Sequence, residues 1–285
     1  GTITYSYRSM PDQSAEATLK YIVESGISAI ELMGGPVEAF AGAPAGAPGA
    51  GAPGGRGPGS PAACAPAGQR AGAPRSAQGV GEPGSPQSAK AGSWNGQPCE
   101  AGGEGGGGGR GGGRGEMTAE QEAAQQEQAN KLKAGRTSVS MDPFKKLRKM
   151  YNDAGVTIYA WKHLSPNMSD EEVEYIFNVA EALGCTHTTV ELPTDPAQLK
   201  RFGDFAMKKK VYAAYHTHTQ GSMTAFDQAL AISKGNMANV DFGHWVAGGN
   251  VGGTPMQFLE KYHDRIASFH LKDRTKPEHC ALNLP

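Results

Sequence analysis

The chain has 285 residues and a formal net charge of -1, which gives no electrostatic reason to expect nucleic acid or an anionic membrane surface as a partner. Its four cysteines show no CxxC spacing, which argues against a zinc knuckle or a disulfide scaffold. No apolar run reaches the roughly 18 residues that a membrane-spanning helix needs. The sequence begins at Gly1 without an initiator Met, so we expect a processed or trimmed start and leave the compartment undecided.

The chain opens with the pattern of a strand, a helix and a second strand. We predict a strand over Ile3–Tyr7, a helix over Ala15–Glu24 that stops at Gly26, and a strand over Ala29–Met33. Residues 1–40 therefore form the first two strand units of the predicted fold.

A low-complexity segment follows the second strand. Residues 41–115 hold 26 of the 41 glycines and 10 of the 19 prolines. Such a composition cannot bury enough apolar surface to offset its ordering entropy. We predict a long Gly/Pro-rich disordered insertion, followed by a Gln/Glu/Ala-rich helical lead over Met117–Leu132. In the predicted domain division, residues 41–130 hold the insertion and nearly all of this helical lead.

From residue 137 onward, amphipathic helices alternate with short apolar strands, which is typical of a parallel sheet wrapped by helices. Ser169 and Glu172 have the spacing of a capping box. The expected helices are Asp142–Asn152, Asp170–Leu183, Ala197–Lys209, Thr224–Ser233 and Pro255–His263. The expected strands are Val156–Trp161, Thr186–Leu192, Val211–His216, Ala238–Phe242 and Ile266–His270. With seven strands in total, we predict an α/β fold, a (β/α)8-type TIM barrel that lacks its last βα unit, with strands three to seven in residues 131–285.

Side chains suited to metal binding gather at the carboxyl ends of four successive strands, which form the active face of a parallel barrel. Imidazole nitrogens and carboxylate oxygens suit Mn, Co, Zn, Fe or Mg rather than a soft metal. We predict that a divalent metal ion is held by a set drawn from Glu191, His216, His218, Asp241 and His270.

Each of these residues also has an interpretation without catalysis. Asp241 could merely cap the following loop, and Glu191 could pair with Lys162. However, Asp241 directly follows Asn239 and Val240 of a predicted strand, and burying its charge is costly unless a positive group compensates it. The histidines interpreted as structural are His163, His187, His263 and His279.

The segments TTVELP, YHTHTQ, VDFGHWVAGG and SFHLKDR resemble the sugar phosphate isomerase/epimerase family of the xylose isomerase-like TIM-barrel superfamily, close to inosose dehydratases and 3-keto-glycoside lyases. The resemblance covers residues 1–40 and 130–285. It implies a divalent metal held by His216 or His218, by Asp241 and by His270. It also implies a fourth ligand, a Glu from an eighth strand beyond Pro285, so the chain is C-terminally incomplete relative to the family.

The resemblance implies a metal-dependent enzyme that removes the proton next to the carbonyl of a sugar, a keto-sugar or an inosose. Such an enzyme would be an isomerase/epimerase or a lyase/dehydratase of carbohydrate metabolism, and the motifs are closer to those of bacterial lyases and dehydratases. Candidate acids and bases are Lys162, Glu191, His244 and Lys272. Glu31, Trp161 and Trp245 are expected either to contact the substrate or to pack the rim.

Two other functions compete with this prediction. An endonuclease IV-like phosphodiesterase shares the superfamily, but the near-neutral charge argues against it. A non-catalytic sugar-binding barrel is the second alternative. The expected partner is a small-molecule sugar, with no nucleic acid and no membrane, and assembly into a homo-oligomer stays open.

Overall fold

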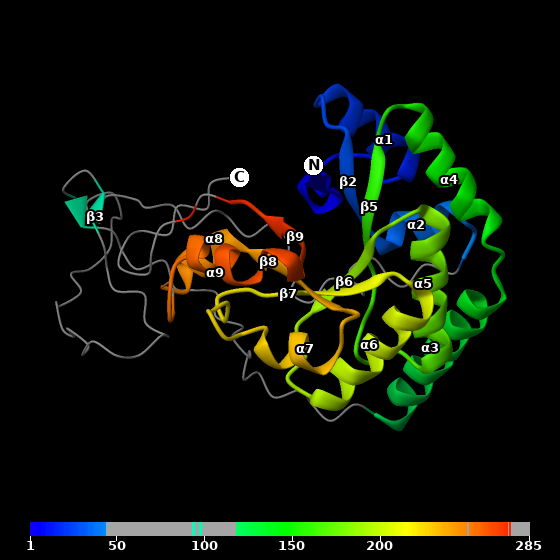
Figure 1. The fold of residues 1–285 in the computed structure, drawn as a ribbon. Coiled ribbons are helices and arrows are strands. Elements are labelled where there is room, and N and C mark those ends of the chain that lie inside the picture. The colour runs from blue at the N-terminus through cyan, green and yellow to red at the C-terminus, as the bar shows by residue number, and fades with distance from the viewer. Residues whose placement is uncertain (44–92, 95–96, 99–117, 250, 273, 275–285) are drawn as a thin grey trace, which may run out of the picture.

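The computed structural model describes residues 1–43, 93–94, 97–98, 118–249, 251–272 and 274. Its main body is a seven-stranded parallel sheet, curled into a half-barrel with its helices on the outer side (Figure 1). This arrangement confirms the predicted α/β barrel with seven strands. In sheet order the strands are β1 (Thr2–Ile3), β2 (Ala29–Met33), β5 (Thr157–Lys162), β6 (His187–Glu191), β7 (Tyr212–His216), β8 (Asn236–Asp241) and β9 (Ile266–His270). A separate antiparallel pair joins β3 (Ser93–Trp94) to β4 (Gln97–Pro98).

The helices alternate with these strands as the sequence indicates. They are α1 (Ala15–Glu24), α2 (Gly34–Phe40), α3 (Ala119–Ser138), α4 (Asp142–Asp153), α5 (Asp170–Leu183), α6 (Pro196–Lys209), α7 (Asp227–Ile232), α8 (Phe242–Ala247) and α9 (Pro255–Tyr262). Two short 3-10 helices are η1 (Thr4–Tyr7) and η2 (His263–Arg265). In the described part of the chain, none of the helices has both the length and the apolar composition that crossing a bilayer requires.

The first strand is shorter than predicted. The strand expected over Ile3–Tyr7 ends at Ile3, and the next four residues form η1. The main-chain amide of Met33 donates to the Thr4 hydroxyl at 2.9 Å. Because a side chain takes this donor at the end of β2, no further ladder bond to the first strand is needed there, and the pairing stops after Ile3 and Glu31.

Two helices were not predicted, and only residues 41–43, 93–94 and 97–98 of the predicted insertion are described. Both α2 and α8 are short and directly follow a strand, so no long apolar period marks them. The predicted helical lead is present as α3, which runs on to Ser138. The remainder of the predicted disordered insertion, residues 44–92, 95–96 and 99–117, lies outside the described residues.

A buried ion pair joins the helices on either side of this insertion. Arg136 of α3 donates from Nε to Glu38 of α2 at 2.8 Å and from Nη1 to Glu172 of α5 at 3.0 Å. Both Glu38 and Arg136 are buried. Since Glu38 precedes the insertion and Arg136 follows it, this pair connects the chain on both sides of the insertion to the same face of the barrel.

The curl of the sheet brings strands that are not sheet neighbours into contact. Thr189 of β6 donates to Glu31 of β2 at 2.6 Å, although β5 lies between these strands. His187 of β6 lies 2.9 Å from the hydroxyl of Ser268 on β9, across the interior of the half-barrel. Polar side chains from strands that are not neighbours therefore meet in the interior of the half-barrel.

Candidate metal centre

The predicted site residues come together at the carboxyl ends of the strands. Parallel register places Asp241 beside His270 and Glu191 beside His216, each pair on adjacent strands. His218 lies two residues beyond the end of β7, and Lys272 lies two residues beyond the end of β9. The structure thus gathers at one rim residues that are up to 81 positions apart in the sequence, from Glu191 to Lys272.

One group of candidate ligands consists of His216, Asp241 and His270. Asp241 Oδ2 lies 3.9 Å from His216 Nε2 and 3.6 Å from His270 Nδ1. One ligand atom from each of the three residues lies within 4.8 Å of the other two. Metal bonds of about 2.0–2.2 Å can span such separations when the ion lies between the donors.

The imidazole of His270 is oriented from behind. Its Nε2 lies 3.0 Å from the carboxylate of Glu31, which is fully buried. A carboxylate only accepts hydrogen bonds, so this contact places a His270 proton on Nε2, and in the neutral ring the Nδ1 lone pair then faces Asp241. Histidines that bind metals usually have such a partner on the second nitrogen, and the donor set therefore fits a divalent ion.

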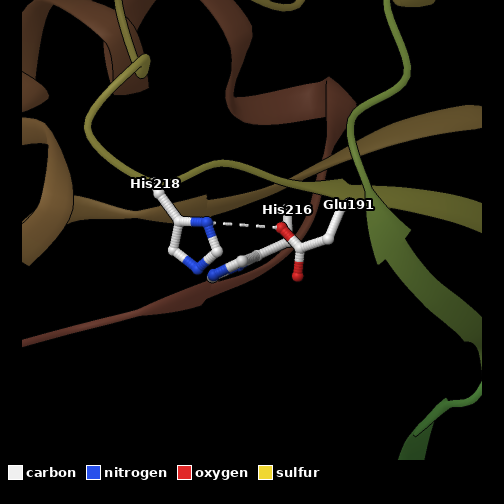
Figure 2. Close-up of side chains that lie close together, drawn as sticks. All are labelled: Glu191, His216 and His218. Carbon is white, nitrogen blue, oxygen red and sulfur yellow. Dashed lines mark ion pairs between the residues drawn. The ribbon is translucent and has the colours of Figure 1, made fainter. Parts of the chain in front are cut away.

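A second group shares His216 with the first. The side chains of Glu191, His216 and His218 also place one ligand atom each within 4.8 Å of one another. Figure 2 shows the His218 ring facing the Glu191 carboxylate, with Nδ1 and Oε2 3.6 Å apart. Glu191 Oε2 is buried and has no hydrogen-bond partner among the described residues. A buried acceptor without a partner is costly, and a cation or a protonated group beside it would remove that cost.

Two lysines supply positive charge to these carboxylates. Lys162 donates to Glu191 Oε1 at 3.0 Å, and Lys272 donates to Asp241 Oδ2 at 2.5 Å. The ion pair between Glu191 and Lys162, which the sequence allowed as an alternative to a catalytic role for Glu191, is therefore present. An ion bound at Asp241 would share that oxygen with Lys272 or replace the lysine as its positive partner.

His244 is connected to the site through Asp241. The main-chain amide of His244 donates to Asp241 Oδ1 at 2.9 Å, so the carboxylate caps α8 while its second oxygen faces the histidines. Arg274 Nη1 lies 2.8 Å from His244 Nδ1. Because arginine only donates, Nδ1 is the acceptor, and a neutral His244 carries its proton on Nε2.

Burial and neighbouring charges shift the acid–base properties of the site. Burial opposes ionisation of Asp241, but His270, His244 and Lys272 together hold its pKa well below the usual range. Burial also acts against ionised Glu31, yet His270, Thr189 and Lys162 bring its pKa down to about 2. Two anions therefore persist inside the barrel end at neutral pH.

The pKa values of the histidines are shifted in opposite directions. Burial, followed by the charges of Lys162 and His270, lowers the pKa of His216 to about 3, so its ring is neutral and can donate a lone pair. Burial also lowers the pKa of His244 to about 3, against the attraction of Asp241. For His270, burial acts to lower the pKa, but Asp241 and Glu31 outweigh it and raise the value.

Three residues near the site have contacts that the sequence alone did not indicate. Glu31 was expected only as a substrate contact or rim residue, and the structure places it behind His270. Asn239 and Arg274 were not singled out, although each contacts a histidine of the site. For Glu31, the sequence did contain a signal: it is the single charged residue in the apolar strand AIELM.

The comparisons with known proteins rest on structure alone. The sequence matches no protein family and no curated protein. The probable 3-DHS dehydratase AsbF, involved in petrobactin synthesis in Bacillus anthracis, is similar with a TM-score of 0.50 and 10% identity, over 96% of this chain and 72% of that one. At this identity the likeness supports the barrel fold alone.

Two further structures overlap less. A xylose isomerase domain protein from Planctomyces limnophilus has a TM-score of 0.39 and 13% identity over 47% of this chain. A D-psicose 3-epimerase, solved in the presence of D-fructose, has a TM-score of 0.30 and 12% identity over 40% of this chain. The matches span 60% of the xylose isomerase domain protein and 52% of the epimerase.

Proposed function

We propose that this chain is a divalent-metal-dependent enzyme that removes a proton next to the carbonyl of a sugar, a keto-sugar or an inosose. The observation that carries the proposal is the group of buried His216, buried Asp241 and half-buried His270, with both imidazoles aimed at one carboxylate oxygen. These three residues would hold the ion, with Glu191 and His218 beside it. When bound, the ion supplies Lewis acidity toward the carbonyl oxygen of the substrate.

Within this proposal Glu191 is the proton acceptor. Its Oε1 is held by Lys162, while Oε2 is buried and lacks a hydrogen-bond partner among the described residues. A carboxylate fixed at one oxygen presents the other in a defined direction, and so the proton next to the carbonyl would move to Glu191 Oε2. His244 is the weaker choice as a base, because its Nδ1 accepts from Arg274 and its Nε2 carries the proton.

The substrate class rests on the motif resemblance of the sequence, and the likeness to the dehydratase supports it only through the shared fold. An isomerase or epimerase returns the proton to carbon, whereas a lyase or dehydratase expels a group from the next carbon. Both outcomes begin with the same proton removal. The proposal therefore covers the two outcomes equally, and a test of the first step tests both.

The experiment compares Asp241→Asn with the parent chain. The change keeps the shape of the side chain and removes its charge, so Co²⁺ affinity and exchange of the substrate α-proton with D₂O should fall together. Asp204→Asn, on the exposed outer side of α6 where Asp204 pairs with Lys200, should alter neither. Unchanged Co²⁺ binding and exchange in Asp241→Asn would disprove the site. Sugar binding by the parent without any exchange would instead support the non-catalytic barrel.

A further inference from the structure

A chain of hydrogen-bonded side chains lies directly below the candidate metal centre, inside the half-barrel. It begins at His216 and passes through Asn239, Ser268 and His187 to Thr186, so it joins β7, β8 and β9 and then crosses back to the start of β6. His187 and Asn239 are buried, and none of these contacts takes part in the chemistry proposed above. The proposed chemistry therefore does not explain why these buried polar side chains are bonded to one another.

The direction of every bond in this chain is set from its far end. The Thr186 hydroxyl donates to the main-chain carbonyl of Tyr159 at 3.1 Å. A carbonyl can only accept, so the hydroxyl has used its proton and must accept from His187 Nδ1, 2.8 Å away. His187 is therefore protonated on Nδ1, and its Nε2 is an acceptor.

The bonds closer to the site also have a fixed direction. Ser268 Oγ lies 2.9 Å from His187 Nε2 and must donate to it, because that nitrogen has no proton. The serine oxygen then accepts from the Asn239 amide nitrogen at 2.8 Å. This contact orients the Asn239 amide so that its oxygen, an acceptor only, lies 3.0 Å from His216 Nδ1. His216 therefore carries its proton on Nδ1.

We propose that Asn239 is a positioning residue, which holds His216 as the Nδ1–H tautomer through a one-directional hydrogen-bond chain that starts at the Tyr159 carbonyl. The tautomer matters because the other nitrogen, Nε2, is the one that faces Asp241 Oδ2. With the proton on Nδ1, Nε2 offers a lone pair toward the place where an ion would bind. The metal part of this inference rests on the proposed function, whereas the tautomer itself does not.

Burial of the chain keeps it in this state. Burial lowers the pKa of His187 to about 4, so the ring is neutral at neutral pH and has one donor and one acceptor, as the chain requires. Chains of buried hydrogen bonds also polarise one another, which favours a single direction over a mixture. Loss of any link should therefore loosen the orientation at His216.

The first test uses the metal-free parent protein. Long-range ¹H–¹⁵N NMR spectra distinguish the two tautomers of a neutral histidine, and the His216 signals are identified by their absence in His216→Gln. We expect the Nδ1–H pattern for His216. The Nε2–H pattern would overturn the inference, whether or not the protein binds any metal.

The second test compares two asparagines of β8 that are both fully buried, Asn239 and Asn236. Asn236 bonds to Tyr215 and to the carbonyls of Leu199 and Ala229, away from the histidines, so Asn236→Ala is a matched control for lost stability. In Asn239→Ala we expect a mixed or Nε2–H tautomer and a Co²⁺ affinity lower by roughly 10–100-fold. Asn236→Ala should keep the tautomer and the affinity.

The outcomes separate this inference from the proposed function. If Asp241→Asn abolishes Co²⁺ binding while Asn239→Ala changes neither affinity nor tautomer, the positioning role is wrong and the metal site stands. If the parent binds no Co²⁺, the proposed function fails, and the NMR spectra still decide the tautomer. Should Asn239→Ala fail to fold, Ser268→Ala removes the next link, keeps Asn239 and should shift the tautomer in the same direction.

Discussion

Glu31 and His270 are separated by 239 positions in the sequence and lie 3.0 Å apart in the barrel interior. Glu31 is the middle residue of β2 and His270 is the last residue of β9, and these strands are not neighbours in the sheet. Their contact exists because the sheet curls until its second and seventh strands face each other. The beginning of the chain thus supplies the group that orients a candidate ligand near its end.

Replacing Glu31 with Gln should destabilise the metal-free protein by about 1.5–3 kcal/mol, the contribution typical of a hydrogen bond to a charged group. The size of the loss should depend on pH. Because the folded-state pKa of His270 is raised, its stabilising effect is fully present below the ordinary value of 6.5 and is lost as pH rises through the folded-state pKa. Urea unfolding should therefore show a larger loss at pH 6 than at pH 9. Equal losses at both values would contradict a charged pair.

His187 gives a pH dependence of the opposite sign. Its folded-state pKa is about 4, against 6.5 for the ordinary side chain, so between these values the unfolded chain binds more protons than the folded one. Stability therefore falls as pH drops through this window, by about 3 kcal/mol at its lower end, and His187 contributes nothing above it. In His187→Gln the slope of unfolding free energy against pH should be smaller by up to about 1.4 kcal/mol per pH unit. His216 and His244 titrate in both proteins, so the difference isolates His187; identical slopes would refute the prediction.

Much of the fold could be predicted because local signals and hydrophobic pattern agree. Ser169 and Glu172 form the expected capping box of α5, and Gly184 ends that helix with a φ of 76°. The alternation of strands and helices after residue 137 was enough to place the strand ends, and with them the candidate ligands. These features depend on residues close together in the sequence.

The contacts that the sequence did not give depend on residues far apart. The end of β1 is set by Thr4 accepting from Met33, 29 positions away. Asn239 is one of two asparagines in β8, and its importance follows only from partners on β7 and β9. No spacing within one strand could indicate such a residue. The contact of Glu31 with His270 could not be predicted either, because the two residues are 239 positions apart.

Removing one partner of the buried ion pair between Glu38 and Arg136 should strongly destabilise the protein. Arg136→Met leaves Glu38 buried without its guanidinium partner, which should cost about 3–5 kcal/mol in unfolding free energy. In that variant Glu38 keeps its contacts with His163 at 3.0 Å and Tyr175 at 3.3 Å but lacks the guanidinium, so adding Glu38→Gln removes a poorly compensated charge and should recover part of the loss. Lys131→Met, which breaks an exposed pair with Glu127 on the same helix, should change stability by less than about 1 kcal/mol. A similar small effect at Arg136 would show that the pair does not hold α3 to the barrel.

Glu191→Gln separates the two roles open to Glu191, ligand and base. As the base, Glu191 supplies the oxygen that receives the substrate proton, so exchange with D₂O should fall by roughly 10²–10⁴-fold while Co²⁺ affinity stays within a few-fold of the parent. As a ligand, it would lower affinity and exchange together. We expect the first result, because Lys162 already neutralises Oε1 and Oε2 faces His218 rather than Asp241. Glu174→Gln, on an exposed ion pair of α5, is the matched control and should leave both measurements unchanged. Exchange at the parent rate in Glu191→Gln would show that another residue is the base. Lys162→Met would then be the next variant to measure, because Lys162 lies 3.0 Å from the Glu191 carboxylate.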